Sequence, residues 1–290
     1  PVLFRTKAET FAFIDAERAT YGVTRLCALY GVTRGGFYAW RARPASAHAE
    51  QDRCLSREIA TRFARHGGRY GSPRIHRELV AAGWTVSRRR VARLMRAAGL
   101  RARAVQGYRA KTGILRFYGQ HPNHLRGTLT TAPDQIWVGD ITYLAIAGQW
   151  QYLAVVMDHF SRRVLAWRLS RRRDSRVTRA VLDAALRRRA PAAGLIFHSD
   201  RGAEYVGAPF GTHLLARGIV QSTTQTGPGD NARMESFFHS LKAEAIRGQT
   251  FPTAAALRRQ LQHYFAYYNQ HRMHSGLGYR SPVAFERAAA

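Results

Sequence analysis

A change in the spacing of apolar residues near position 130 constrains the fold most. Downstream of it, apolar and polar residues alternate over 135–146, 152–157 and 164–169, which predicts three strands. The connections between these runs are short. Three consecutive strands should therefore pair as a meander.

Helices and strands then alternate along the chain. The expected elements are a helix over 175–189, a strand over 195–198, a helix around 210–216, a strand over 218–223, a loop at Gly227–Gly229 and a helix from Asp230. A meander followed by this alternation describes a mixed sheet flanked by helices, an α/β fold.

Upstream of the sheet the pattern is helical. Leu26, Leu29 and Tyr30 recur at helical spacing, Gly31 interrupts the pattern, and Thr33 can cap the next helix. This arrangement predicts a first helix-turn-helix.

A second helix-turn-helix is expected further along. Ser72 is the expected cap of its first helix, Gly83 lies in the turn, and Ser87 can cap a helix that ends at Ala97. The residues expected to face its core are Ile75, Leu79, Val80, Val91, Leu94 and Met95.

The charge balance is strongly basic, with 46 Lys and Arg against 18 Asp and Glu and a net charge of +28. Such a balance indicates a polyanionic partner rather than a small metabolite. A hydrophobic content of 46% excludes a disordered basic tail. No acid occurs between Leu79 and Pro133, where eleven Arg and Lys are concentrated, and this stretch favours a DNA-binding face.

The outward side of the helix after Ser87 carries Arg88, Arg89, Arg90 and Arg93. Positive charge near a helix N-terminus opposes the macrodipole by ~0.3–1 kcal/mol. A DNA partner that neutralises the cluster gives a physical reason for its placement, and a solvated charged face is the alternative.

These patterns divide the chain into four parts. They are a helix-turn-helix segment over 1–45, a second, DNA-binding one over 46–100, a basic linker over 101–130, and an α/β domain with a C-terminal helical extension over 131–290. The aromatic residues in the linker could follow a nucleic-acid backbone or belong to an ordinary connector.

The two cysteines, Cys27 and Cys54, show no metal-ligand spacing with the histidines, which argues against a zinc finger or a disulfide framework. A reducing cytosol fits this usage. No apolar run approaches the ~18 residues of a membrane span.

Three acids stand out as candidates for chemistry. Asp140 interrupts an apolar strand, Asp200 follows the end of another, and Glu235 lies early in the helix from Asp230. Each alone has a structural explanation, as an ion-pair partner, a turn residue or a charge near a helix end. Together they fit a divalent metal site in which two Mg²⁺ ions ~3.5–4 Å apart act on phosphate.

The helix of Glu235 adds polar residues at helical spacing. Asn231, Glu235, His239 and Lys242 should share one face, which suits a DNA end, although a mixed solvated face is an equal alternative.

The chain resembles bacterial insertion-sequence DDE transposases, in the branch whose catalytic core is closest to retroviral integrase. The resemblance runs from Gly68 to Phe285 and rests on an ordered set of motifs, residues 137–144, 152–158, 198–202, 230–242 and 268–282.

The resemblance implies an RNase H-like mixed sheet with Asp140, Asp200 and Glu235 as catalytic metal ligands and two Mg²⁺ or Mn²⁺ ions per site. It also implies DNA cleavage and strand transfer without a covalent enzyme intermediate, and contact of Lys242 with terminal DNA. The expected partners are duplex DNA, at the terminal inverted repeats and at the target, and further copies of the chain, at least as a dimer. The expected location is the bacterial cytosol at the nucleoid.

The chain lacks the N-terminal His/Cys zinc unit of retroviral integrases, and helix-turn-helix segments take that place. In this branch the active enzyme is often a frameshifted fusion with an upstream coiled-coil product, and no heptad repeat occurs here. A stripe in the C-terminal helix instead predicts a core face, formed by Leu257, Leu261, Tyr264, Phe265 and Tyr268.

Two other functions remain open from the sequence. One is a DNA-binding regulator of transposition without catalysis, which the intact acid triad disfavours. The other is a nuclease with the RNase H fold, which the upstream helix-turn-helix segments disfavour.

Overall fold

The computed structural model describes residues 4, 6–44, 46–103, 121–146, 148–225 and 231–289. Several expectations lie outside these ranges: most of the linker with its aromatic residues, the glycine-rich loop at Gly227–Gly229, and Asp230. No described helix is long and apolar enough to cross a membrane.

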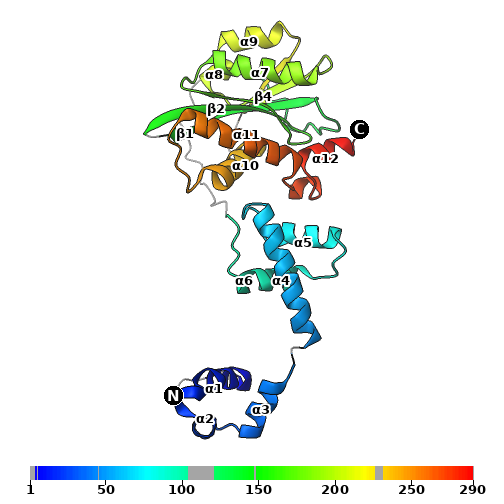
Figure 1. The fold of residues 1–290 in the computed structure, drawn as a ribbon. Helices are drawn as coiled ribbons and strands as arrows, with labels where there is room; N and C mark the ends of the chain where they lie inside the picture. The colour runs from blue at the N-terminus through cyan, green and yellow to red at the C-terminus, as the bar shows by residue number, and fades with distance from the viewer. Residues whose placement is uncertain are drawn as a thin grey trace.

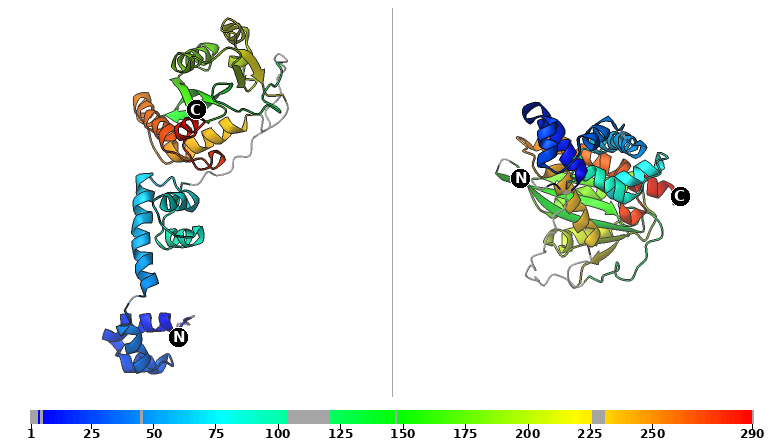
Figure 2. Two further views of the ribbon diagram at one scale, coloured as in Figure 1. Left: turned by 90° about the vertical axis from the view of Figure 1, so that its right-hand side faces the viewer. Right: turned by 90° about the horizontal axis from the view of Figure 1, so that it is seen from below.

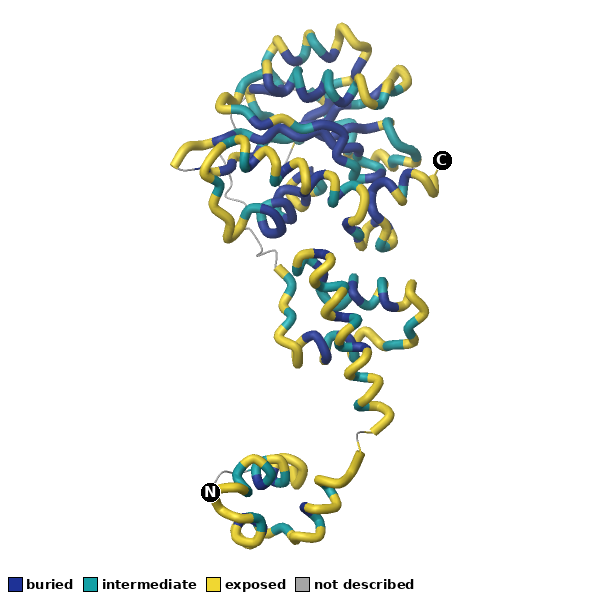
Figure 3. The backbone as a smooth tube through the Cα atoms, in the orientation of Figure 1, coloured by how far each residue is buried: buried dark blue, intermediate teal, exposed yellow. Residues whose placement is uncertain are grey.

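The N-terminal helices are α1 (Lys7–Tyr21), α2 (Val23–Leu29) and α3 (Arg34–Ala42). They pack around a small core that contains Ile14, Leu26 and Phe37. Thr33 caps α3 as predicted, because its hydroxyl accepts a hydrogen bond from the Gly36 amide. Many of the other residues of this segment are exposed to solvent (Figure 3).

A second helical group follows, with α4 (Ala47–Arg65), α5 (Ser72–Ala81) and α6 (Arg88–Ala97). Ser87 caps α6 as predicted, since its hydroxyl accepts from the Arg90 amide. The expected core residues are buried except Val80, which is 47% exposed and does not belong to the core of this group. The predicted cap at Ser72 is wrong, because α5 begins one residue earlier, with Gly71 as its N-cap.

Helix α4 is the largest element that the sequence patterns missed. Its residues Leu55 and Ile59 are buried in the same core as Ile75 and Leu79 of α5. The second helical group is therefore a three-helix unit rather than a bare helix-turn-helix.

The predicted meander is confirmed by strands β1 (Ile136–Ile146), β2 (Gln149–Asp158) and β3 (Val164–Ser170), which pair antiparallel. Strands β4 (Ile196–Ser199) and β5 (Val220–Thr223) extend the sheet in parallel from β1. The resulting order, β3-β2-β1-β4-β5, is the RNase H-like arrangement that the resemblance implied.

Helices cover both faces of this sheet, as Figure 1 shows. One face carries α7 (Ser175–Arg189), α8 (Ala203–Val206) and α9 (Ala208–Leu215). The other carries α10 (Ala232–Leu241), the π-helical turn η1 (Lys242–Ile246) and α11 (Ala254–Gln270). All five residues of the predicted stripe on α11 are buried in this second core, so the stripe is a core face.

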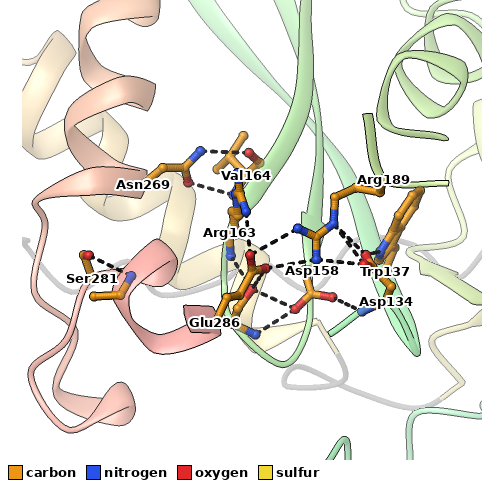
Figure 4. A network of polar contacts seen from close by, with 11 residues as sticks. Asp134, Trp137, Asp158, Arg163, Val164, Arg189, Asn269, Ser281 and Glu286 are labelled. Atoms are coloured by element: carbon orange, nitrogen blue, oxygen red, sulfur yellow. Dashed lines mark hydrogen bonds and ion pairs between the residues drawn. The ribbon is translucent and has the colours of Figure 1, made fainter. Parts of the chain in front are cut away.

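The chain ends with the short 3-10 helix η2 (Ser275–Leu277) and α12 (Pro282–Arg287). Figure 4 shows the polar network that fixes α12 to the sheet. Arg163 and Arg189 both donate to Glu286, and Arg189 also pairs with Asp134 ahead of β1. The C-terminal helix is thereby tied to the beginning of β1 and to α7.

The second helical group contacts the C-terminal segment. The fully buried Tyr70 hydroxyl donates to the His271 carbonyl at 2.8 Å and accepts from the Met273 amide at 2.9 Å. Arg103 donates to the Glu244 carbonyl at 3.0 Å. Both views of Figures 1 and 2 (left) accordingly place this group on the side of the sheet that carries α10 and α11.

Candidate active site

Strand register brings two of the predicted acids together. In the parallel pair of β1 and β4, Gly139 lies opposite Ser199, so the following residues, Asp140 and Asp200, lie side by side. Adjacent strands are ~4.8 Å apart, which places two carboxylates next to each other. They are sixty positions apart in the sequence, and only the sheet joins them.

Both carboxylates are partly desolvated. Burial and then the neighbouring charge of Asp200 raise the pKa of Asp140 well above its ordinary value, although the Ile141 amide donates to it at 2.7 Å. Burial raises the pKa of Asp200 as well, against the hydrogen bond from the Gly202 amide at 3.0 Å. Two carboxylates in this position favour a cation between them.

A third carboxylate, Glu204, completes this acidic group and was not singled out in the sequence. It is 6% exposed, and its charge contributes to the raised pKa of both aspartates. Gly202 allows the close approach, because a Cβ there would lie 2.6 Å from a Glu204 oxygen and 3.0 Å from an Asp200 oxygen. The sequence signal that could have identified Glu204 is its position four residues after Asp200.

One arginine balances this acidic group in part. Arg173 contacts Glu204 at 2.7 Å, and its charge also lowers the pKa of Asp140 and Asp200. Because three carboxylates face one guanidinium, the acidic group keeps a net negative charge at a partly buried position. No sequence pattern connects Arg173 with these acids, of which Glu204 lies 31 residues further along the chain.

Glu235 does not belong to the acidic group formed by Asp140, Asp200 and Glu204. It is exposed on the first turn of α10 and lines a cavity together with His239. Among the described residues, no three His, Cys, Asp or Glu side chains are grouped as a metal site, so Glu235 does not complete a ligand set with Asp140 and Asp200 in this conformation.

The single polar face predicted for this helix is wrong in part. Glu235 and His239 line the same cavity, but Asn231 is the N-cap, with non-helical backbone angles, and lines a different one with His159. Lys242 belongs to the π-helical turn after α10, and its ammonium lies 4.9 Å from the centre of the Tyr143 ring. Burial lowers the pKa of Lys242, and the charge of the nearby Asp140 opposes this shift.

One arginine of α6 differs from the prediction that all face outward. Arg88, Arg89 and Arg93 are exposed as predicted, whereas Arg90 is half-buried. Arg93 and Arg90 turn towards α4 and bind Asp52 at 2.6 Å and 2.7 Å, and these two hydrogen bonds hold the pKa of that carboxyl below its usual range. Asp52 lies on α4, the helix that the sequence did not predict.

Asp140 and Asp200 fit a divalent cation on chemical grounds. They supply hard oxygen donors and are partly removed from water, and the charge of Asp200 raises the pKa of Asp140, a repulsion that a bound cation relieves.

The sheet and its acid pair define a protein with an integrase core. Models of the integrase core domain match residues 130–228 and 217–282, and a model of an HTH-like domain matches residues 50–108.

Full-length relatives then give the family. The chain is 35% identical over 282 residues to transposase InsF for insertion sequence IS3A of Escherichia coli K12, covering 95% of this chain and 98% of that protein. It is also 35% identical to a 31 kDa protein of insertion element IS600 of Shigella sonnei, covering 90% and 97%. The chain belongs to the insertion-sequence transposases of the IS3 InsF family.

Among solved structures, an intasome of simian T-cell lymphotropic virus in complex with a PP2A regulatory subunit matches with a TM-score of 0.47 and 19% identity, over 59% of each chain.

Proposed function

We propose that the chain catalyses cleavage and strand transfer of DNA at the ends of its insertion sequence. The observation that carries this proposal is the juxtaposition of Asp140, within β1, and Asp200, just after the end of β4, with raised pKa values and an incomplete counter-charge. In open mixed sheets, a strand end such as that of β4 is the usual place for ligands.

Asp140 and Asp200 would hold Mg²⁺ or Mn²⁺, two ions per site, with Glu235 as the third candidate ligand. Such ions polarise the scissile phosphate and lower the pKa of an attacking water or 3′-hydroxyl. Glu204 and Arg173 would position the aspartates, because they fix the charge around them.

The residues beside the acid pair would orient the DNA. Lys242 lies near Asp140 and can bind a phosphate of the terminal nucleotides, while His239 borders the cavity of Glu235. Asn231, whose amide is buried without a hydrogen-bond partner among the described residues, is a further candidate.

Recognition of the terminal repeats would involve the segment over residues 46–100. Arg88, Arg89 and Arg93 are the exposed candidates on α6, and Arg90 and Arg93 would act from their contacts with Asp52. Synapsis of two element ends calls for at least two copies of the chain, on DNA in the bacterial nucleoid.

The test is strand transfer with labelled duplex ends of the element, in Mg²⁺ and in EDTA. Joined products should require the metal and disappear with Glu235→Gln, while Glu9→Gln, at an exposed acid on α1, should leave them unchanged. Specific binding without joining would instead indicate a regulator, and cleavage of an RNA–DNA hybrid would indicate a nuclease.

A separate measurement tests the DNA contacts proposed for α6. Arg88→Ala with Arg89→Ala should flatten the dependence of log affinity on log salt by about 2 units, since each phosphate contact contributes about one. An unchanged slope would place the contact elsewhere.

A further inference from the structure

A cavity of about 470 Å³ lies beside α10, between the second helical group and the core. Six arginines from distant parts of the sequence line it: Arg69, Arg74, Arg103, Arg162, Arg233 and Arg272. The first three come from the helical group and the segment after it, and the others come from the β2–β3 turn, α10 and the segment after α11.

Acidic groups do not balance this charge. Two carboxylates, Glu235 and Glu244, line the cavity. Glu244 is committed to Arg272 through a buried ion pair at 2.7 Å and also accepts from the Tyr264 hydroxyl. Glu235 has no ion pair among the described residues.

The other five arginines have neutral contacts within the described part of the chain. Arg69 and Arg103 donate to the main-chain carbonyl of Glu244, at 3.5 Å and 3.0 Å. Arg233 donates to the His159 carbonyl, and Arg74 lies over the Tyr70 ring at 5.3 Å. These contacts orient the guanidinium groups without neutralising them.

Arg162 is held in the cavity under strain. Its backbone has φ = 60°, a left-handed conformation that is unfavourable for a side chain of this size. Its guanidinium lies where a Cβ on Gly276 would have to be, and its Nε is buried without a hydrogen-bond partner among the described residues.

The cations also oppose one another. Burial, then the charge of Arg272, lowers the pKa of Arg74. His274, which also lines the cavity, has its pKa lowered to about 2 by burial and by Arg272, Arg162 and Arg74. A neutral His274 adds no charge, and an anion would relieve the repulsion among the arginines.

We infer that this cavity binds a backbone phosphate of the DNA, next to Glu235. This inference rests on the proposed function, because the DNA that supplies the phosphate is the substrate proposed above. Guanidinium forks match phosphate oxygens in geometry and remain charged when partly buried. Since the arginines come from both the helical group and the core, a phosphate here would connect end recognition with the active site.

The test combines a protein variant with a DNA variant. Neutral methylphosphonates replace single phosphates along the element end, and binding of wild type and of Arg74→Gln/Arg162→Gln is measured by fluorescence anisotropy in EDTA. Wild type should lose about tenfold affinity at one or two adjacent positions, and the double variant should be insensitive there, with a salt slope lower by about 1 because one phosphate contact is lost.

Two control proteins complete the design. Arg258→Gln/Arg259→Gln removes the same charge from an exposed part of α11 and should keep the wild-type sensitivity. Arg74→Lys/Arg162→Lys keeps the charge and should restore most of the salt slope. Equal sensitivity of wild type and the glutamine variant at every position would overturn the inference, as would competition by inorganic phosphate as strong as that by DNA.

Strand transfer is measured separately with the same proteins. Wild-type joining together with a failed methylphosphonate result would overturn the phosphate site alone. A positive methylphosphonate result without joining by wild type would overturn the proposed chemistry alone, and absence of DNA binding by wild type would overturn both.

Discussion

Two groups of carboxylates lie near β1, and they differ in how far arginines and hydrogen bonds neutralise and satisfy them. Ahead of the strand, Asp134, Asp158 and Glu286 form the network of Figure 4 with Arg163 and Arg189. Further along, Asp140 joins Asp200 and Glu204 around a single guanidinium, that of Arg173.

The hydrogen bonds sharpen this contrast. Burial raises the pKa of Asp158, yet this carboxylate accepts from the Ser161 amide, the Ser161 hydroxyl and the Asp134 amide. Among the described residues, the one hydrogen bond to the Asp140 carboxylate comes from the Ile141 amide. A carboxylate with all its oxygens satisfied stabilises a fold, whereas one with free oxygens and excess negative charge is suited to bind a cation.

The largest expected effect is on catalysis. Asp200→Asn should reduce strand joining by about 10³-fold or more, because metal coordination contributes several kcal/mol to the transition state. The same substitution at Asp158 should leave joining within about threefold at a temperature where the protein is folded. Single-turnover joining rates measure both, and equal losses would remove the distinction between the two groups.

The next effect is on stability. Arg189→Ala leaves Asp134 and Glu286 without their shared cation and should lower the free energy of unfolding by about 3 kcal/mol. Arg187→Ala, at an exposed position two residues earlier, should change it by less than about 0.5 kcal/mol. Urea unfolding distinguishes the two, and a similar midpoint for both would show that the network of Figure 4 is not stabilising.

A smaller effect of opposite sign is expected at Asp140. Because its pKa is raised in the folded protein, the stability it contributes is complete below its ordinary pKa of 3.8 and is lost as the pH rises through the folded value. Asp140→Asn should therefore stabilise the metal-free protein at pH 7 by about 1 kcal/mol, about 2–4 °C in Tm.

This gain should disappear near pH 3, and Mg²⁺ should raise the Tm of wild type but not of the variant. Thermal unfolding in EDTA and in Mg²⁺ measures both. A variant less stable than wild type at pH 7 in EDTA would contradict the raised pKa.

The smallest effect is at Glu204. Glu204→Gln removes a neighbouring negative charge and releases Arg173, and both changes lower the pKa of Asp140 and Asp200. The acidic limb of the pH–rate profile should move to lower pH by less than about one unit. A shift to higher pH would mean that Glu204 does not act through its charge.

Local patterns were sufficient for much of the fold. The alternation of apolar residues gave the meander, and the helix over 175–189 has the predicted bounds. Helix α4 was missed because its apolar residues are sparse and it is stabilised by packing against α5 and α6 rather than by a strong amphipathic period. Tertiary contacts of this kind are not visible in a local window.

The sequence predicted individual residues of the candidate site but not the contacts between them. Asp140 and Asp200 were recognisable because one interrupts an apolar strand and the other follows one. Glu204 and Arg173 were not, because an ion pair between α8 and the segment after β3 has no local signature. The outward direction of Arg90 was mispredicted for the same reason, since its partner Asp52 lies 38 residues away.

The sequence by itself determined the family, the order of the elements and the scarce acids that can do chemistry, because these depend on residue type and short-range spacing. Tertiary structure alone decided which charges meet. Parallel pairing of β1 with β4 joined Asp140 to Asp200, and docking of the helical group on the C-terminal segment gathered the arginines beside Glu235. Charges interact through space, over distances that the chain reaches only when it is folded.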